Sequence, residues 1–201
     1  RSEMLSGISH DLRTPLTRIK LQLAFIKDKQ LSSKLSQDVI EMEKMLNEYL
    51  QFSKNRSSEK GEKFNLSKLL EDTIKKYNNK NILTEITQNI LFHGKKTLII
   101  RCISNILDNS LKYGKNIKVS LKKSSNNIIL LIDDDGPGIP KNEYENVFKP
   151  FYKIDKSRSE TKSSVGLGMS ITSDIIQSHG GNIKLQKSIL KGLQVRITLP
   201  F

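Results

Sequence analysis

The chain has 201 residues, of which 36% are hydrophobic and 27% charged, a balance that indicates one large or two small globular domains and excludes a disordered chain. The net charge is +13, but the lysines are dispersed and no helix-turn-helix, zinc-finger or RNA-binding aromatic motif accompanies them, so we expect no direct binding of nucleic acid. The single cysteine, Cys102, excludes a disulfide framework and a cysteine metal site. No apolar stretch approaches the roughly 18 residues that cross a bilayer.

Residues 1–56 carry the pattern of two amphipathic helices. Apolar residues recur every three or four positions along residues 5–26 and again along residues 35–52, with a break around residues 27–33. A helical hairpin this small cannot cover both apolar stripes, whereas pairing with a second copy into a four-helix bundle buries them. We therefore predict a dimerisation domain over residues 1–56.

A polar stretch over residues 57–63 predicts a linker, and residues 64–201 predict a second domain that mixes helices and strands. The predicted helices cover residues 66–77 (with Asn65 as a possible cap), 95–113 and 166–178, and the predicted strands cover residues 81–87, 88–92, 117–123, 128–133, 182–188 and 193–199. A mostly antiparallel or mixed sheet with helices predicts an α/β sandwich. Residues 136–165 lack periodicity, which is typical of a functional or mobile loop.

His10 lies within SHDLRTPLTRIK on the first predicted helix, next to Asp11 and four residues before Thr14. A neutral imidazole can attack phosphorus, and a nearby carboxylate can hold its other ring nitrogen as N–H. Pro15 removes a backbone hydrogen bond and predicts a bend beside this histidine. An ordinary surface histidine remains an alternative interpretation of His10 alone.

Asn105 and Asn109 lie one helical turn apart in RCISNILDNSLKYG, among apolar neighbours. Buried amides need partners, and an amide oxygen suits a Mg²⁺ ion that also binds water and triphosphate oxygens. Lys112 and Tyr113 follow, and they offer a phosphate contact and a flat ring. A capped, partly exposed helix is the alternative.

Two glycine-containing motifs follow. LIDDDGPGIP places carboxylates at the end of a predicted strand, where one can accept from the amino group of adenine while glycines let the backbone approach the base. A plain turn has the same residues. SSVGLGMSIT places two glycines ahead of a helix, whose N-terminus can bind phosphate. Two such glycines are weak support by themselves, and the chain lacks the Walker motif.

The order of these motifs resembles the sensor histidine kinases of two-component signalling. SHDLRTPLTRI resembles their H-box, in particular that of the EnvZ type of osmosensor, NILDNSLKYG the N-box, DDDGPGI the G1 box, VFKPFYKID the F-box and GLGMSI the G2 box. The resemblance covers residues 2–200. It implies an α + α/β architecture: a helical-hairpin dimerisation and phosphotransfer domain (a four-helix bundle as a dimer), followed by a Bergerat-type α/β sandwich that binds ATP.

The resemblance also implies a role for each matched residue. His10 accepts the γ-phosphoryl group of ATP with help from Asp11, and Thr14 positions water in the reverse dephosphorylation of the regulator. Asn109 binds Mg²⁺ and Asn105 supports it. Contacts to ATP are implied for the remaining matched residues, namely Lys112, Tyr113, Asp134 (which reads adenine), Gly136, Gly138, Phe148, Phe151, Lys153, Gly166, Leu167 and Gly168.

The implied partners are a second copy of the chain and the receiver domain of a response regulator, most simply of the OmpR type. Because the chain starts at Arg1 inside a helical pattern, we expect an excised fragment. The resemblance implies that this fragment is the cytoplasmic portion of a bacterial inner-membrane protein. The chain departs from the family at Ser164, where a glycine is common, and at Lys153, where an arginine is common. Lys153 presents a point charge instead of a planar fork.

Two other functions stay open at the level of sequence. A related clamp ATPase without phosphohistidine usually needs a carboxylate where Asn105 stands, and Asp108 is expected to point elsewhere. A non-catalytic module that binds a regulator is the second, and the intact Asn109, Asp134 and glycines disfavour it.

Overall fold

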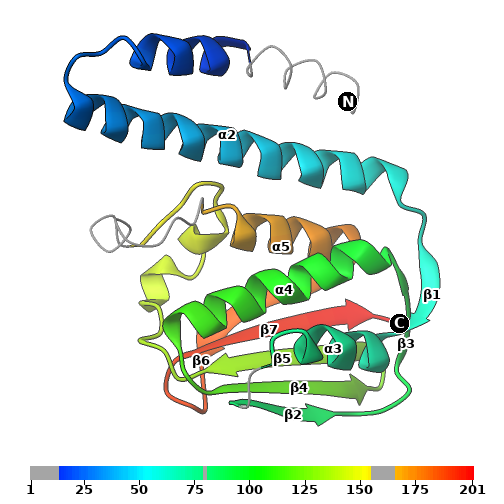
Figure 1. Ribbon diagram of the computed structural model, residues 1–201. Coiled ribbons are helices and arrows are strands. Elements are labelled where there is room, and N and C mark those ends of the chain that lie inside the picture. The colour runs from blue at the N-terminus through cyan, green and yellow to red at the C-terminus, as the bar shows by residue number, and fades with distance from the viewer. Residues whose placement is uncertain (1–13, 79–80, 155–165) are drawn as a thin grey trace. The chain divides into compact units, whose positions relative to one another are not determined.

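The computed structural model describes residues 14–78, 81–154 and 166–201 (Figure 1). The chain divides into two compact units. Among the described residues, one unit takes 14–58 with 166–167, and the other takes 59–154 with 168–201. The predicted fold class, a helical region followed in the chain by an α/β sandwich, is confirmed.

The first unit contains a helical hairpin. Residues 14–23 are helical, a turn follows, and helix α2 covers Lys29–Ser58. The break predicted around residues 27–33 is therefore shorter than expected, because the carboxylate of Asp28 accepts hydrogen bonds from the backbone N–H groups of Gln30 and Leu31 and starts α2 at once. A small apolar cluster joins the two helices, formed by Leu16, Leu23 and Val39 with Ile26, Leu35 and Leu46 around them.

The segment predicted as a linker is mostly regular structure. Helix α2 continues to Ser58, and strand β1 begins at Glu62, so only residues 59–61 lie outside helix and strand. Residues 57–63 are polar, but polar composition alone does not distinguish a linker from the end of a helix or from a short strand such as β1. The domain boundary itself stays a prediction.

The second unit is built on a mixed five-stranded sheet in the order β2-β4-β5-β7-β6. Strand β2 runs parallel to β4, and the other neighbours are antiparallel. The strands are β2 (Ile82–Ile86), β4 (Ile117–Ser124), β5 (Asn127–Asp134), β6 (Asn182–Lys187) and β7 (Leu193–Pro200). A separate two-stranded sheet pairs β1 (Glu62–Asn65) with β3 (Leu91–Gly94).

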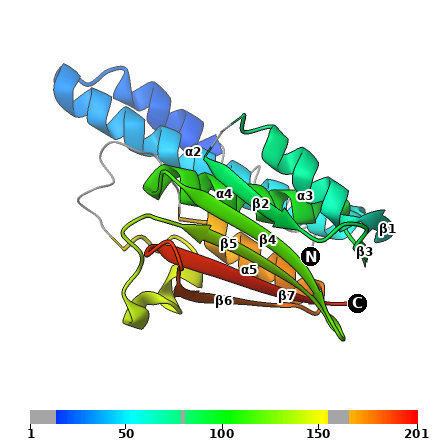
Figure 2. The same ribbon diagram turned by 90° about the horizontal axis from the view of Figure 1, so that it is seen from below.

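Three helices cover one face of the sheet (Figure 1, Figure 2). They are α3 (Leu66–Lys75), α4 (Lys96–Tyr113) and α5 (Gly168–Ser178), and two short 3-10 turns, η1 (Lys141–Glu143) and η2 (Asn146–Phe148), follow β5. Asn65 caps α3 as predicted, since its Oδ1 accepts from the N–H of Lys68 at 3.0 Å. Helix α5 begins two residues later than predicted, and the strand predicted at 88–92 is β3 at Leu91–Gly94.

Apolar side chains between these helices and the sheet form the core of the second unit. From the sheet they come from alternate positions of β4 and β5, as expected for strands with one covered face. The most deeply buried are Leu66, Leu70, Leu98, Ile103, Ile106, Leu107, Ile117, Leu121, Ile128, Ile132 and Ile175. This packing fixes α4 over the end of β5, where the predicted site residues lie.

Candidate functional site

Asn105 ties helix α4 to the start of helix α5. Its Nδ2 donates to the carbonyl oxygen of Gly168 at 3.2 Å and to Oγ1 of Thr172 at 3.4 Å. Thr172 Oγ1 donates to the same carbonyl at 2.8 Å. The amide of Asn105 is thus engaged within the protein, which suits a supporting role better than a ligand role.

Asn109 lies one turn further along α4 and is half-buried. Its side chain makes no hydrogen bond to any residue in the described part of the chain. A polar group held on a rigid helix without a protein partner is available to a ligand. A neutral amide oxygen is a hard ligand of the kind that suits Mg²⁺ together with phosphate oxygens and water, so this residue fits the implied metal.

Asp134, the last residue of β5, is buried, and three donors orient its carboxylate. Oδ1 accepts from the backbone N–H groups of Gly136 and Leu193, each at 3.0 Å, and Oδ2 accepts from Oγ of Ser110 at 3.3 Å. Since a carboxylate oxygen can accept about two hydrogen bonds, Oδ2 retains capacity for a further donor. The amino group of a purine is such a donor.

Asp135 holds the loop between α4 and β4. Its Oδ1 accepts from the N–H groups of Lys115 and Asn116 at 2.7 and 2.9 Å, and its Oδ2 accepts from Nδ2 of Asn116 at 2.6 Å. The hydrogen bonds from Asn116, and then that from Lys115, lower the pKa of Asp135 below its usual value. Helix α4 is therefore anchored to the end of β5 by two successive carboxylates.

Close backbone approach explains the glycine that follows. A Cβ on Gly136 would lie 3.0 Å from Oδ1 of Asp134 and 3.1 Å from the carbonyl oxygen of Tyr113. Gly138 has φ of +70°, a conformation that favours glycine. The DDDGPG segment thus needs these glycines to turn tightly beside α4.

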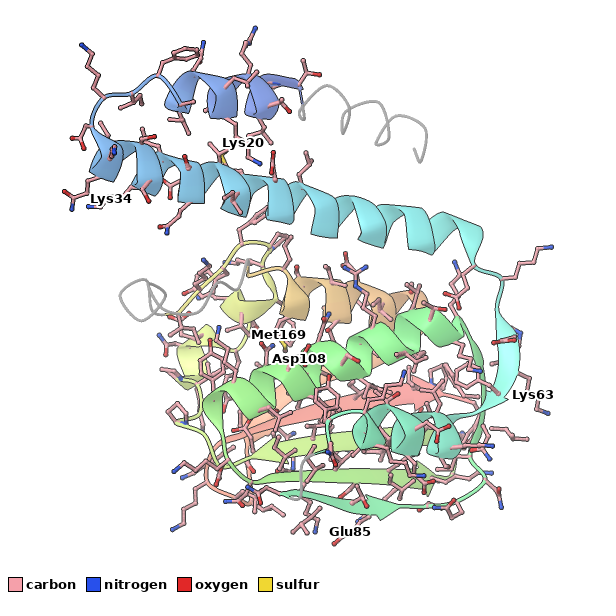
Figure 3. The ribbon with its side chains drawn as sticks, in the orientation of Figure 1. Lys20, Lys34, Lys63, Glu85, Asp108 and Met169 are labelled. Carbon is pink, nitrogen blue, oxygen red and sulfur yellow. The ribbon has the colours of Figure 1, made fainter. Side chains whose placement is uncertain are left out.

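Two further predicted residues lie at the end of α4. The ring of Tyr113 is 58% exposed, and Nζ of Lys112 lies 5.2 Å from its centroid. Asp108, labelled in Figure 3, accepts a hydrogen bond from the hydroxyl of Tyr77 at 2.9 Å. The carboxylate of Asp108 thus contacts the residue after α3, which agrees with the expectation that it points elsewhere.

The segment after β5 contains a small polar network that the sequence did not reveal. The carboxylate of Glu143 accepts from the hydroxyl of Tyr152 and from Nδ2 of Asn146 at 3.0 Å. These bonds, that from Tyr152 first, lower the pKa of Glu143. Phe148 is half-buried in η2, whereas Phe151 is 54% exposed and has φ of +63°. The network thus links η1, η2 and Tyr152 within the stretch that contains the two phenylalanines.

The remaining predicted residues have varied settings. His10 and Asp11 lie outside the described residues, as does Ser164. Thr14 is exposed at the start of the described helix, and Lys153 is half-buried. Gly166 has φ of +77° and Leu167 is buried directly before α5.

Three participants were missed by sequence reasoning: the hydroxyl of Ser110 and the backbones of Gly192 and Leu193. Ser110 follows Asn109 directly, so its proximity to the site could have been noticed. The other two come from a turn about 60 residues after Asp134, and no local pattern indicates that contact.

None of the helices in the described ranges combines the length and the apolar character that crossing a membrane requires.

The chain matches two family models. The histidine kinase-, DNA gyrase B- and HSP90-like ATPase model matches residues 94–201, and the His Kinase A (phospho-acceptor) domain model matches residues 1–58. The first match covers more than half of the chain. It includes α4, Asp134 and the glycines of the site, and the second match includes His10.

Individual proteins give the same picture. The sensor histidine kinase GtrS of Pseudomonas aeruginosa is 35% identical over 202 residues, which cover 100% of this chain and 42% of GtrS. The sensor histidine kinase CpxA of Escherichia coli K12 is 29% identical over 225 residues, with 100% and 47% covered. The structure of full-length ShkA in complex with AMPPNP has a TM-score of 0.71 at 16% identity, covers 100% of this chain and 46% of ShkA, and supports the fold alone.

The chain spans less than half the length of these curated relatives. These relatives are GtrS and CpxA, so they do not support the narrower resemblance to the EnvZ type of osmosensor. With a match to the phospho-acceptor domain model followed by a match to the ATPase model over more than half of its length, the chain belongs to the histidine kinase-, DNA gyrase B- and HSP90-like ATPase family.

Proposed function

We propose that this chain is the autokinase core of a two-component sensor, which transfers the γ-phosphoryl group of ATP to His10 and then to an aspartate of a response regulator. The family assignment supports the reaction class, and the relatives named above are sensor histidine kinases. The matching ATPase model supports ATP as the proposed nucleotide, and ShkA, which shares the fold, was solved with the ATP analogue AMPPNP.

One arrangement carries the proposal. Helix α4 presents Asn109 between two anchored neighbours: Asn105 holds the carbonyl of Gly168, and Ser110 donates to the carboxylate of Asp134. Asn109 itself makes no hydrogen bond among the described residues. A rigid helix that carries an amide with no hydrogen bond to the described residues, directly before a serine bonded to Asp134, can position the two ends of a nucleotide.

The transfer needs little covalent chemistry from the protein. A lone pair on a neutral ring nitrogen of His10 forms the bond to the γ-phosphorus, the bond to the β,γ-bridging oxygen breaks, and ADP leaves. Asp11 is proposed to hold the second ring nitrogen as N–H, and Thr14 to position water when the regulator is dephosphorylated. Bound Mg²⁺, held through Asn109, would neutralise charge on the phosphates.

The partners follow from the same proposal. We expect a homodimer, because the phospho-acceptor hairpin leaves large apolar side chains exposed. An OmpR-type regulator is the proposed recipient of the phosphoryl group, and the basic net charge of +13 would favour encounter with its acidic site. A membrane-anchored parent protein with this core in the cytoplasm, and an EnvZ-type osmosensing role, are proposed from the H-box resemblance.

The proposal is tested by incubating the protein with γ-labelled ATP and Mg²⁺ and measuring acid-labile, base-stable label on the protein. The parent is expected to become labelled and His10→Gln is expected to carry none. His93→Gln is the matched control, since His93 lies exposed in β3 and should leave labelling intact.

A second variant tests the nucleotide side. Asn109→Ala is expected to lower labelling by roughly a hundredfold or more, while Asn127→Ala, a substitution of the same type at the exposed start of β5, should retain it. If His10→Gln is labelled as well as the parent, phosphoryl transfer to His10 is wrong. If the parent binds no ATP in a titration, the kinase assignment of this chain is wrong.

A further inference from the structure

Asp133 is a buried carboxyl group that the proposed reaction does not use. It precedes Asp134 in β5 and is only 2% exposed. Successive strand residues point to opposite faces, so the side chain of Asp133 lies on the face away from α4. Its carboxyl group accepts from Oγ of Ser188 at 2.8 Å and from Nε2 of Gln194 at 3.0 and 3.2 Å. A buried carboxyl group is costly unless such bonds offset the loss of water.

The two partners of Asp133 lie at either end of the turn between β6 and β7. The turn is closed by the N–H of Ser188, which donates to the carbonyl of Gly192 at 3.0 Å. Oγ of Ser188 also accepts from the N–H of Leu190 at 2.9 Å. Lys191 adopts φ of +79°, a strained conformation for a residue with a side chain. The surrounding bonds, including those to Asp133, hold this turn in one shape.

The same turn supplies two donors to Asp134. The N–H of Gly192 donates to the carbonyl oxygen of Asp134 at 3.2 Å, and the N–H of Leu193 donates to its Oδ1 at 3.0 Å. Any displacement of the turn would therefore move a donor that orients the carboxylate of Asp134. Asp133 and Asp134 therefore both form hydrogen bonds to residues in or beside this turn, and their side chains lie on opposite faces of β5.

We propose that Asp133 is a positioning residue for base recognition: through Ser188 and Gln194 it sets the β6–β7 turn, so that the backbone N–H of Leu193, which follows the turn, aims the carboxylate of Asp134 at the exocyclic amine of the nucleotide base. This inference rests on the proposed role of Asp134 in reading adenine. It adds that selection of a 6-aminopurine over a 6-oxopurine depends on a carboxyl group on the opposite face of the sheet.

The test measures binding of two nucleotides that differ at this position, ATP and inosine triphosphate, to the full chain with Mg²⁺. Gln194→Glu sets a second carboxyl group against Asp133 and should push the turn away. The preference for ATP over inosine triphosphate is expected to fall roughly tenfold, about the contribution of one well-placed hydrogen bond to a charged group.

Exchanging the donor and the acceptor between residues 133 and 194 should restore the preference for ATP over inosine triphosphate. In the double variant Asp133→Asn with Gln194→Glu, the amide of residue 133 donates to the new carboxylate, and Ser188 can still donate to the amide oxygen. We expect the preference to return to within about twofold of the parent, because the pair is directly coupled. Gln177→Glu, on the exposed side of α5, is the matched control and should change nothing.

The outcomes distinguish the positioning role of Asp133 from the base-reading role of Asp134. If Gln194→Glu melts like the parent and keeps the parental preference, the role of Asp133 is wrong, and failure of the double variant to recover counts against it equally. If Gln194→Glu does not fold, Ser188→Ala, which deletes a single hydroxyl, replaces it, and an unchanged preference then overturns the inference. If the parent binds ATP without preferring it, the base-reading role of Asp134 fails first, and this inference fails with it.

Discussion

The helical hairpin and the sandwich differ in how completely each buries its own apolar side chains. Among the described residues of the hairpin, a buried cluster is formed by Leu16, Leu23 and Val39. Large apolar side chains remain exposed in the same region, and Phe25 is 87% exposed. In the sandwich, three helices and a five-stranded sheet enclose a continuous core, and several of its side chains are fully buried.

The contrast teaches where each region obtains its stability. A two-helix layer covers only one stripe of each helix, so the remaining apolar surface favours a second copy of the chain. The sandwich needs no partner for its core, and the rigid packing of α4 on β5 is what holds Asn105, Asn109 and Asp134 in place. Stability and the nucleotide site are thus coupled in the sandwich, and substitutions there should affect both.

The largest effect is expected from Gly192→Ala. A Cβ at this position would lie 2.4 Å from Oδ1 of Asp134, 2.5 Å from its carbonyl oxygen and 2.5 Å from the backbone nitrogen of Gly136. Backbone and a buried carboxylate cannot yield cheaply, so we expect about 3 kcal/mol of destabilisation. ATP affinity should fall by roughly a hundredfold or more, because the carboxylate of Asp134 must move. Titration calorimetry and urea unfolding measure the two effects.

Gly180→Ala is the control that introduces backbone strain at a glycine outside the proposed nucleotide site. Gly180 has φ of +71°, but a Cβ there would meet only the side chain of Pro200 at 3.4 Å. This variant should lose about 1 kcal/mol of stability and bind ATP as the parent does. Equal ATP affinities for Gly192→Ala and the parent would contradict the role given to the β6–β7 turn.

A pair of leucine truncations tests the contrast between the regions. Leu107→Ala removes a fully buried side chain of the sandwich and should cost about 3 kcal/mol. This loss should not depend on protein concentration. Leu23→Ala removes a side chain from the small hairpin cluster, and its effect should grow as the chain is diluted if the proposed dimer stabilises the hairpin. Thermal melts at two concentrations a hundredfold apart measure both.

The concentration dependence is the decisive observation. If the parent melts identically at both concentrations, and Leu23→Ala shifts the melt by the same amount at each, the hairpin is stable without a second copy. The proposed homodimer would then lose its physical basis in the exposed apolar side chains.

Most of the architecture was accessible from the sequence because periodicity reports burial directly. Helix α4 and strands β4 and β5 have long one-sided or buried patterns and lie close to the predicted ranges. The end of α2 was placed too early because exposed helical residues and linker residues have the same polar composition. Strand β1 was missed for a similar reason, since it has only four residues, two of them exposed and two half-buried.

The site was only partly predictable. Asn105, Asn109 and Asp134 stand in local motifs whose chemistry can be read from a few neighbours. The donors that orient Asp134 include the N–H of Leu193. This residue lies in β7, which the strand order of the sheet places beside β5. A backbone N–H has no sequence signature, so a contact made by Leu193 could not be inferred before the strand order was known.

The smallest effect we expect concerns Tyr77, which joins the end of α3 to α4. Its hydroxyl donates to Oδ1 of Asp108 at 2.9 Å and to the carbonyl of Ser104 at 3.3 Å. Burial, more than the neighbouring Asp108, raises the pKa of Tyr77 to about 12 from its usual 10.0. The folded state thus favours the neutral phenol, and its contribution is complete below pH 10.

That contribution should disappear as the pH rises from 10.0 to about 12, because the unfolded chain then loses the proton before the folded chain does. At pH 8, Tyr77→Phe should cost about 1 kcal/mol or less, since the ring is partly exposed. The gap between the variant and the parent should narrow steadily above pH 10 in urea unfolding. Tyr113→Phe, at a residue that is 58% exposed, is the matched control at pH 8 and should unfold like the parent. A constant gap from pH 8 to pH 12 would mean that the hydroxyl of Tyr77 stabilises α4 without its proton.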